Sequence, residues 1–225
     1  MTSAERAAAT HAVRDLTGVA LSTPRLILRE FREADIDAIA EACQDDEIQR
    51  YTMLPTPYGR ADAERFVRKT CPAGRAAGTD AGFGVFTAET AETADAAETG
   101  DAADAANAAG SADTSSLVGA VGLHNIAQVD EPAGGTAGIG YWTAPWARRH
   151  GYTTEAVGAV CRWGFQEFGL ALIRWDAIVG NDGSWEVARR NGFVREGTRR
   201  ASLLHRGVRR DMWVGSLLAA EFAER

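Results

Sequence analysis

A chain of 225 residues with 45% hydrophobic residues can bury a core as one large domain or two small ones, and its formal net charge is −7. This charge excludes a general nucleic-acid-binding surface, because binding along a phosphate backbone requires an excess of basic residues. No apolar run approaches the ~20 residues that cross a bilayer. The start, MTSAERAAATHAVRDLTG, lacks the apolar stretch of a secretion signal, so we expect a cytoplasmic protein without a membrane partner.

The first part of the chain alternates strand-like and helical patterns. The run RLILREF (25–31) predicts a strand, and EADIDAIAEAC (33–43) repeats its apolar residues at the spacing of an amphipathic helix. A second helical pattern, RADAERFVRK (60–69), and a strand-like FGVF (83–86) follow. We therefore expect α and β elements to alternate from the start.

Residues 87–116 interrupt this alternation with a segment rich in alanine and acidic residues. The segment holds seven acidic residues and no Lys or Arg, so the remainder of the chain is balanced at 24 acidic and 24 basic residues. Its acids recur at every third residue from Glu89 to Asp104, which distributes them around a helix and leaves no apolar stripe. We predict a solvated acidic insert within one domain; an acidic docking arm is the alternative.

After this segment the pattern is two strands, a helix, a strand, a short helix and two final strands. The strand-like runs are LVGAVGLHNI (117–126), AGIGYW (137–142), IRWDAIV (173–179) and a last pair that ends in DMWVGSLL (211–218), and the short helix is SWEVARRN (184–191). This order predicts a mixed α/β domain in which an antiparallel meander precedes a β-α-β crossover.

Neither the cysteines nor the histidines have the spacing of a metal site or a disulfide framework. The three cysteines are odd in number and far apart, which predicts reduced thiols. The four histidines are equally scattered, so we expect no metal. The residues concerned are Cys43, Cys71, Cys161, His11, His124, His150 and His205.

The run ARRHGY (147–152) places two arginines and a glycine where a strand gives way to a helix. The first turn of a helix carries unpaired N–H groups and a partial positive charge, which suit a phosphate or pyrophosphate. Gly151 would let the backbone approach such a group. The alternative is that Arg148 and Arg149 are solvated and that Gly151 only turns the chain.

Several blocks in the same order resemble the GCN5-related N-acetyltransferases (GNAT), and within them the branch typified by the ribosomal-protein N-terminal acetyltransferases. The family reads R/Q-x-x-G-x-G/A at its pyrophosphate loop, and Arg148, Gly151 and Thr153 fall on these positions, with threonine in place of the small residue. The runs GYW (140–142) and GYTTEAV (151–157) are similar to the same branch.

Further blocks extend the resemblance over roughly residues 21–222. NDGSWEVARRNGFVREGTRR (181–200) is similar to the run N-x-x-S…GF-x-x-EG of the branch, and TPRLILREFREADIDAI and DMWVGSLLAAEF are similar to its opening and closing elements. The matching positions of the first of these are Asn181, Ser184, Gly192, Phe193 and Glu196. Gly138 departs from the branch, which often carries an acidic residue two positions before Gly-Tyr-Trp.

The resemblance implies an α/β (α+β) single domain, with a central mixed, mostly antiparallel sheet flanked by helices. We expect this acetyltransferase domain to cover residues 21–225, after an N-terminal extension of residues 1–20. It also implies acetyl-CoA as cosubstrate, without a metal. The residues expected to contact acetyl-CoA are Tyr141, Trp142, Thr143, Arg148, Arg149, His150, Gly151, Tyr152, Thr153 and Asn181.

The implied reaction is direct attack of a neutral amine on the thioester, which needs proximity and no enzyme nucleophile. Backbone N–H groups near Trp142 and Thr143 would stabilise the developing oxyanion. Ser184 would be the catalytic residue, donating its hydroxyl to the departing thiolate; an ordinary turn and helix cap is the alternative for NDGS.

The general base is left open between Glu47 and a chain of water molecules. An α-amine has a reference pKa of about 8 and a lysine side chain about 10.4, so an N-terminal acceptor needs less help to become neutral. Glu155 and Glu196 also match family positions, but neither is assigned a catalytic role.

The favoured function is an N-acetyltransferase whose acceptor is a protein or peptide N-terminal amine. The alternatives are a small-amine acetyltransferase, acting on an aminoglycoside, a polyamine or an amino acid, and a non-catalytic acetyl-CoA-binding module. A homodimer is left open, and no nucleic-acid partner is expected.

Overall fold

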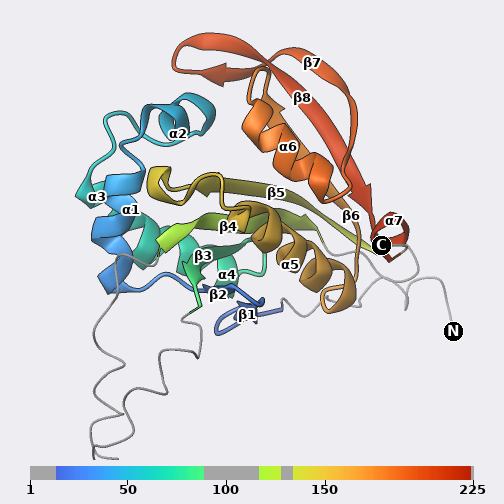
Figure 1. The fold of residues 1–225 in the computed structure, drawn as a ribbon, viewed down its shortest axis with the longest axis horizontal. Helices are drawn as coiled ribbons and strands as arrows, with labels where there is room; N and C mark the ends of the chain where they lie inside the picture. Colours follow the sequence, from blue (N-terminus) through green and yellow to red (C-terminus); the bar gives the residue numbers. More distant parts are fainter. Residues whose placement is uncertain (1–13, 89–116, 128–133, 224–225) are drawn as a thin grey trace, which may run out of the picture.

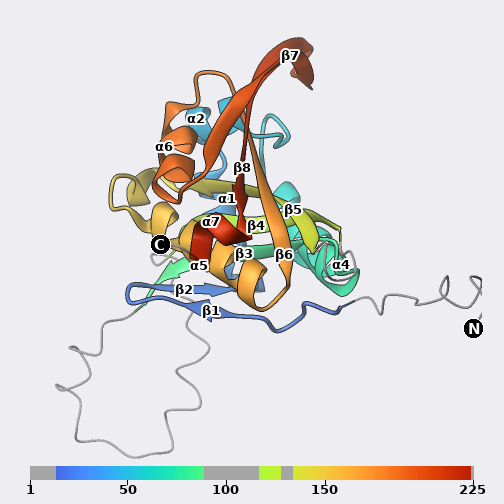
Figure 2. The same cartoon turned by 90° about the vertical axis from the view of Figure 1, so that its right-hand side faces the viewer.

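The computed structural model describes residues 14–88, 117–127 and 134–223. The strands in these ranges are β1 (Leu21–Ser22), β2 (Leu26–Arg29), β3 (Ala81–Thr87), β4 (Leu117–Ala127), β5 (Gly135–Thr143), β6 (Leu170–Ile178), β7 (Val194–His205) and β8 (Val208–Leu218). They form one sheet in the order β1-β2-β3-β4-β5-β6-β8-β7 (Figure 1). The sheet twists strongly, so that β6 and β8 run across the direction of β1 and β2 (Figure 2).

The described helices lie on both faces of this sheet. They are α1 (Ile36–Ala42), α2 (Asp46–Tyr51), α3 (Arg60–Arg65), α4 (Cys71–Ala76), α5 (Tyr152–Gln166), α6 (Asp182–Arg190) and α7 (Ala219–Ala223). A π-helical turn joins α3 to α4 without a break. The expected single α/β domain with a mostly antiparallel sheet is confirmed.

The order of pairing also follows the prediction. Strands β1 to β5 are antiparallel neighbours, which is the expected meander. β5, α5 and β6 form the expected crossover, and β5 and β6 are parallel. Thr87 pairs with Leu26, so β3 takes the first residue of the predicted insert. The rest of that prediction, from 89 to 116, lies outside the described residues.

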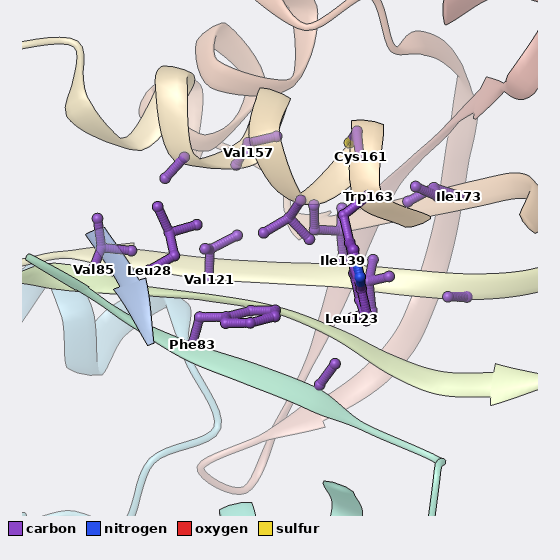
Figure 3. Close-up of a cluster of buried hydrophobic side chains, with 14 of the residues drawn as sticks. Leu28, Phe83, Val85, Val121, Leu123, Ile139, Val157, Cys161, Trp163 and Ile173 are labelled. Carbon is purple, nitrogen blue, oxygen red and sulfur yellow. The ribbon is translucent and has the colours of Figure 1, made fainter. Parts of the chain in front are cut away.

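Two apolar cores lie on opposite faces of the sheet because alternate residues of a strand point to opposite sides. α5 covers the larger core, where Val157 and Cys161 pack against Phe83 and Val121 (Figure 3). On the other face, α1 and α3 cover a smaller core of buried residues that includes Ile36, Ile39, Ala63, Val67 and Phe86. The apolar face predicted for 33–43 is buried as expected, and α5 likewise buries one apolar face.

The chain before β1 is joined to the domain through Leu16 and Arg75. Leu16 is 1% exposed and belongs to the larger core. The buried guanidinium of Arg75 donates to the carbonyl oxygens of Leu16 (2.6 Å) and Gly82 (2.8 Å). The described part of the segment expected to precede the domain therefore contacts it closely.

The three cysteines are free thiols, and burial raises the pKa of each to about 12. Within the described ranges, no group of three His, Cys, Asp or Glu side chains has the arrangement of a metal site. No helix of the described chain has the length and apolar character needed to cross a membrane.

Candidate active site

The centre of the sheet opens where β5 and β6 separate. Their parallel pairing ends at Ile139 and Trp175, although β5 continues to Thr143 and β6 to Ile178. Beyond this point β5 remains paired with β4, and β6 remains paired with β8. The last residues of β5 therefore present a free backbone edge toward the gap.

The hydrogen-bond alternation of β5 decides which of its N–H groups face this edge. The N–H of Ala144 donates to the carbonyl of Val118 (2.8 Å). Alternate residues of an antiparallel strand face alternate neighbours, so Trp142 directs its N–H toward β4, and Tyr141 and Thr143 direct theirs to the gap. Backbone N–H groups near Trp142 and Thr143 were expected to stabilise the oxyanion. The N–H of Thr143 faces the gap and can donate to a ligand there, whereas that of Trp142 faces β4.

The loop before α5, residues 148–151, has a backbone geometry that suits an anion and is called the anion loop below. Arg149 and Gly151 both have positive φ, 67° and 77°, and alternation of this kind turns successive N–H groups inward. Among the described residues, no side chain caps α5. The N–H groups of its first turn, from Tyr152 to Thr154, therefore keep their partial positive charge toward the loop.

Arg25 and Glu155 hold the start of α5 in place. The guanidinium of Arg25 contacts the Glu155 carboxylate at 2.7 Å and 2.6 Å, donates to the carbonyl of His150 and lies over the ring of Tyr152. Thr23 donates to the same carboxylate (2.5 Å). Burial raises the pKa of Glu155, but the hydrogen bonds from Thr23 and Arg25 outweigh it and hold the pKa below its ordinary value.

Arg148, expected to meet the pyrophosphate, forms ion pairs with the start of α2. Its guanidinium lies 2.5 Å from Asp45 and 3.1 Å from Glu47. Asp45 also caps α2 by accepting the N–H groups of Glu47 and Ile48. Burial raises the pKa of Asp45, but Arg148 and the cap hydrogen bonds hold it below its ordinary value. Arg148 thus connects the anion loop to α2.

Ser184 lies at the start of α6, across the gap from β5. Asn181 caps this helix by accepting the N–H of Ser184 (3.1 Å), so Ser184 itself is not the cap. The Ser184 hydroxyl accepts the indole N–H of buried Trp175 (3.1 Å) and donates to the Tyr141 hydroxyl (3.2 Å). Tyr141 donates to the Ser184 carbonyl (2.7 Å), and burial raises the pKa of its phenol, which keeps it a neutral donor.

One cavity of about 770 Å³ joins these parts. All but one of the predicted site residues line it: Tyr141, Trp142, Thr143, Arg148, Arg149, Gly151, Tyr152, Thr153, Asn181 and Ser184. His150 does not line it; its ring stacks on that of Tyr152 at 5.3 Å. Glu47, the candidate base, lies in the wall contributed by α2, with its side chain 59% exposed.

The two departures from the family pattern each have a local partner. The hydroxyl of Thr153 hydrogen-bonds that of Thr143 at 2.5 Å, which ties the first turn of α5 to the end of β5. At Gly138, the place of a side chain is taken by the ring of His124 from β4, 2.3 Å from where a Cβ would lie. An acidic side chain at position 138 therefore requires His124 to move.

Sequence reasoning did not predict α2 as a helix or most of what it adds to the cavity. Ile48, Tyr51 and Thr52 line the cavity beside Glu47. The signal that could have found this helix is the cap residue Asp45, followed by two acidic residues in the first turn.

The chain is similar to known acetyltransferases. The family described as the acetyltransferase (GNAT) domain matches residues 25–194. YdaF of Bacillus subtilis (strain 168), which carries the provisional name of a ribosomal N-acetyltransferase, is 36% identical over 107 residues. That match covers 48% of this chain and 56% of YdaF, so the chain spans about half the length of this relative.

Solved structures share the fold. RimJ of Mycobacterium smegmatis, in complex with a CoA disulfide, has a TM-score of 0.68 at 17% identity, over 90% of this chain and 87% of its own. An acetyltransferase of Salmonella typhimurium is described as modifying the N-terminal serine of ribosomal protein L7/L12. It has a TM-score of 0.68 at 16% identity, over 89% of this chain and 99% of its own. Since the family match spans most of the sheet and the whole anion loop, the chain belongs to the GNAT acetyltransferases.

Proposed function

We propose that this protein transfers the acetyl group of acetyl-CoA to the N-terminal amine of a protein or peptide. The observation that carries the proposal is the single cavity joining three features: the uncapped start of α5, the open edge of β5 and the Asn181–Ser184 turn. The relatives named for ribosomal N-acetylation and for an N-terminal serine support a polypeptide acceptor.

The residues fit acetyl-CoA in two places. The N–H groups at the start of α5, with Arg148 and Arg149, offer donors and positive charge to a pyrophosphate. The free edge of β5 offers N–H and C=O groups to the amides of the pantetheine arm, and Asn181 lies across from it. Acetyl-CoA supplies the activated acyl group, whose thiolate is a good leaving group.

The catalytic work proposed for the chain is positioning and charge stabilisation. A neutral amine held in the cavity attacks the thioester carbonyl; the C–N bond forms, the C–S bond breaks and the amine loses a proton to Glu47 or to water. The N–H of Thr143 donates to the carbonyl oxygen as its charge grows. Ser184 gives up its hydrogen bond to the Tyr141 hydroxyl and donates the same proton to the sulfur as the thiolate leaves.

The test is thiol release from acetyl-CoA in the presence of an amine panel, with the modified atom located by mass spectrometry. Peptides with a free N-terminus should be acetylated at the α-amine, whereas the same peptides with a blocked N-terminus should not react. Turnover of small amines alone would contradict the peptide acceptor. Tight acetyl-CoA binding without turnover of any amine would identify a binding module instead.

A further inference from the structure

We infer that a second cavity, between α2 and the tip of the β7–β8 hairpin, binds acidic side chains of the acceptor polypeptide downstream of its N-terminus. This inference rests on the proposed function and adds a substrate class to it. The cavity has a volume of about 490 Å³. Three exposed arginines line it, Arg50 from α2 and Arg206 and Arg210 from the hairpin, with Asp46 as the acidic residue of its described wall.

The hairpin tip is fixed against α2, so this cavity is a built feature of the fold. Arg206 and Gly207 form a two-residue turn, with φ of 51° and 76°, that joins β7 to β8. The Arg206 guanidinium donates to the carbonyl of Gln49 (2.6 Å). The ring of buried His205 hydrogen-bonds the carbonyl of Thr52 (3.0 Å). The tip and α2 lie side by side at the top of Figure 1.

The charge of the cavity is available to a ligand. Among the described residues, Arg50 and Arg210 form no ion pair with a carboxylate. Cross-strand register places Arg210 opposite Leu203, on the same face as His205 and therefore toward α2. A ligand with carboxylates would pair with these guanidinium groups, which prefer planar anions.

The second cavity adjoins the acetyl-transfer cavity. Tyr51 lines both, and its hydroxyl donates to the carbonyl of Gly180 (3.0 Å) beside Asn181. A peptide whose N-terminus reaches the gap between β5 and β6 therefore leaves past Tyr51 toward Arg50 and Arg210. Because Tyr51 lines both cavities, the residues that follow the reacting amine come within reach of the arginines, at about 3.3–3.6 Å of extended chain per residue.

Three other arginines of the hairpin make contacts of their own and do not extend this positive charge into a stripe that would suit a phosphate backbone. Arg195 lies about 5 Å over the rings of Trp185 and Trp213. Arg199 forms an ion pair with Asp176, and Arg209, on the opposite face from Arg210, donates to a backbone carbonyl. A compact site for a few carboxylates fits this distribution better than RNA does.

The experiment compares two acceptor peptides with the same first three residues, followed by four glutamates in one and four glutamines in the other. The wild-type protein should acetylate the glutamate peptide with a kcat/KM higher by at least about fivefold, carried by KM. Arg210→Gln, and the double variant with Arg50→Gln, should remove this preference. Arg200→Gln, at an exposed hairpin position outside the cavity, is the matched control and should retain it.

Equal kcat/KM for both peptides, or equal loss of preference in the Arg200 variant, would overturn the inference. If neither peptide is acetylated, the proposed function fails and fluorescence anisotropy of the labelled peptides decides the docking. Binding of the glutamate peptide that Arg210→Gln abolishes would uphold the acidic site, and equal binding of both peptides would overturn it. Binding of a single-stranded RNA probe instead, with the same arginine dependence, would also overturn it.

Discussion

At the scale of single residues, the Ser184 hydroxyl has a structural role, as the acceptor of the Trp175 indole N–H, and a proposed catalytic role. Ser184→Ala should lower kcat by about 10- to 1000-fold and leave CoA affinity within about threefold, because donation to the thiolate belongs to the transition state. The same change leaves the N–H of Trp175, which is 1% exposed, without its acceptor. The free energy of unfolding should therefore also fall by about 1–3 kcal/mol. Steady-state kinetics and thermal unfolding measure both effects.

A control separates the two roles of this hydroxyl. Trp175→Phe removes the indole N–H and keeps the Ser184 hydroxyl, so it should destabilise the fold while kcat falls by less than about fivefold. A destabilised Ser184→Ala protein with full kcat would contradict the catalytic assignment. The helix cap is unaffected in either variant because Asn181 provides it.

Arg148 has to exchange one anion for another if it binds the pyrophosphate. In the structure it is paired with Asp45, which also caps α2. Asp45→Asn removes the charge and keeps the cap, because asparagine caps a helix as well as aspartate does. Coenzyme A should then bind about two- to fivefold tighter, the range expected for a partly exposed ion pair. Calorimetry measures the affinity.

The matched control for this exchange is Asp46→Asn, which removes the neighbouring charge of α2 and should leave the affinity unchanged. Weaker binding of coenzyme A to the Asp45 variant would mean that Asp45 orients Arg148 toward the cosubstrate. Arg148→Gln should weaken binding more than tenfold, about 1.4 kcal/mol, in either case.

At the scale of elements, the start of α5 depends on the charge of Glu155. Its pKa is lower in the folded protein than in the unfolded chain, so its contribution is present above the unfolded pKa and is lost as pH falls through the folded value. Glu155→Gln should lower the melting temperature by about 2–4 °C at pH 7, or about 1 kcal/mol for a chain of this size. The difference from wild type should shrink as the pH falls from 6 to 3.

Thermal unfolding over this pH range, with Glu41→Gln on an exposed part of α1 as control, tests the argument. A difference that stays constant with pH would mean that shape and not charge explains the loss. The control should follow the wild-type protein at every pH.

The elements that the sequence predicted are those whose pattern is local. β4, β5 and α5 carry long periodic runs, and the anion loop combines glycine with arginine at a helix start. By contrast, α2 has six residues and one buried side chain, Ile48, too few for a periodic signal. The pairing of Arg148 with Asp45 joins positions 103 residues apart, and no single-sequence pattern reports such a contact.

At the scale of the whole molecule, both cavities depend on contacts between α2 and segments that lie far along the chain from it. α2, near residue 50, is held by Arg148, by Gly180 and by the hairpin tip around His205. The gap between β5 and β6 itself is formed by the central strands of the sheet. The acceptor side is thus the part least determined by local sequence, which agrees with the difficulty of predicting the acceptor.

The acidic segment leaves and returns at adjacent positions of the sheet. Phe86 of β3 pairs with Leu117 of β4, so the ends to be joined already lie side by side. Deletion of Glu89 to Asp113 leaves Ala88 and residues 114–116 as a four-residue connection, a length that hairpins commonly use.

The shorter loop has a lower closure entropy cost, by on the order of 1–2 kcal/mol. The melting temperature should therefore stay the same or rise by about 2–8 °C, since about 1 kcal/mol corresponds to 2–4 °C in a chain of this size. Coenzyme A affinity should change by less than about twofold, because the described cavity walls take no residue from this segment.

A second variant with residues 89–113 in scrambled order keeps their length and charge. Lower stability or affinity in both variants would mean that the segment packs on the domain or contributes to binding in its native order.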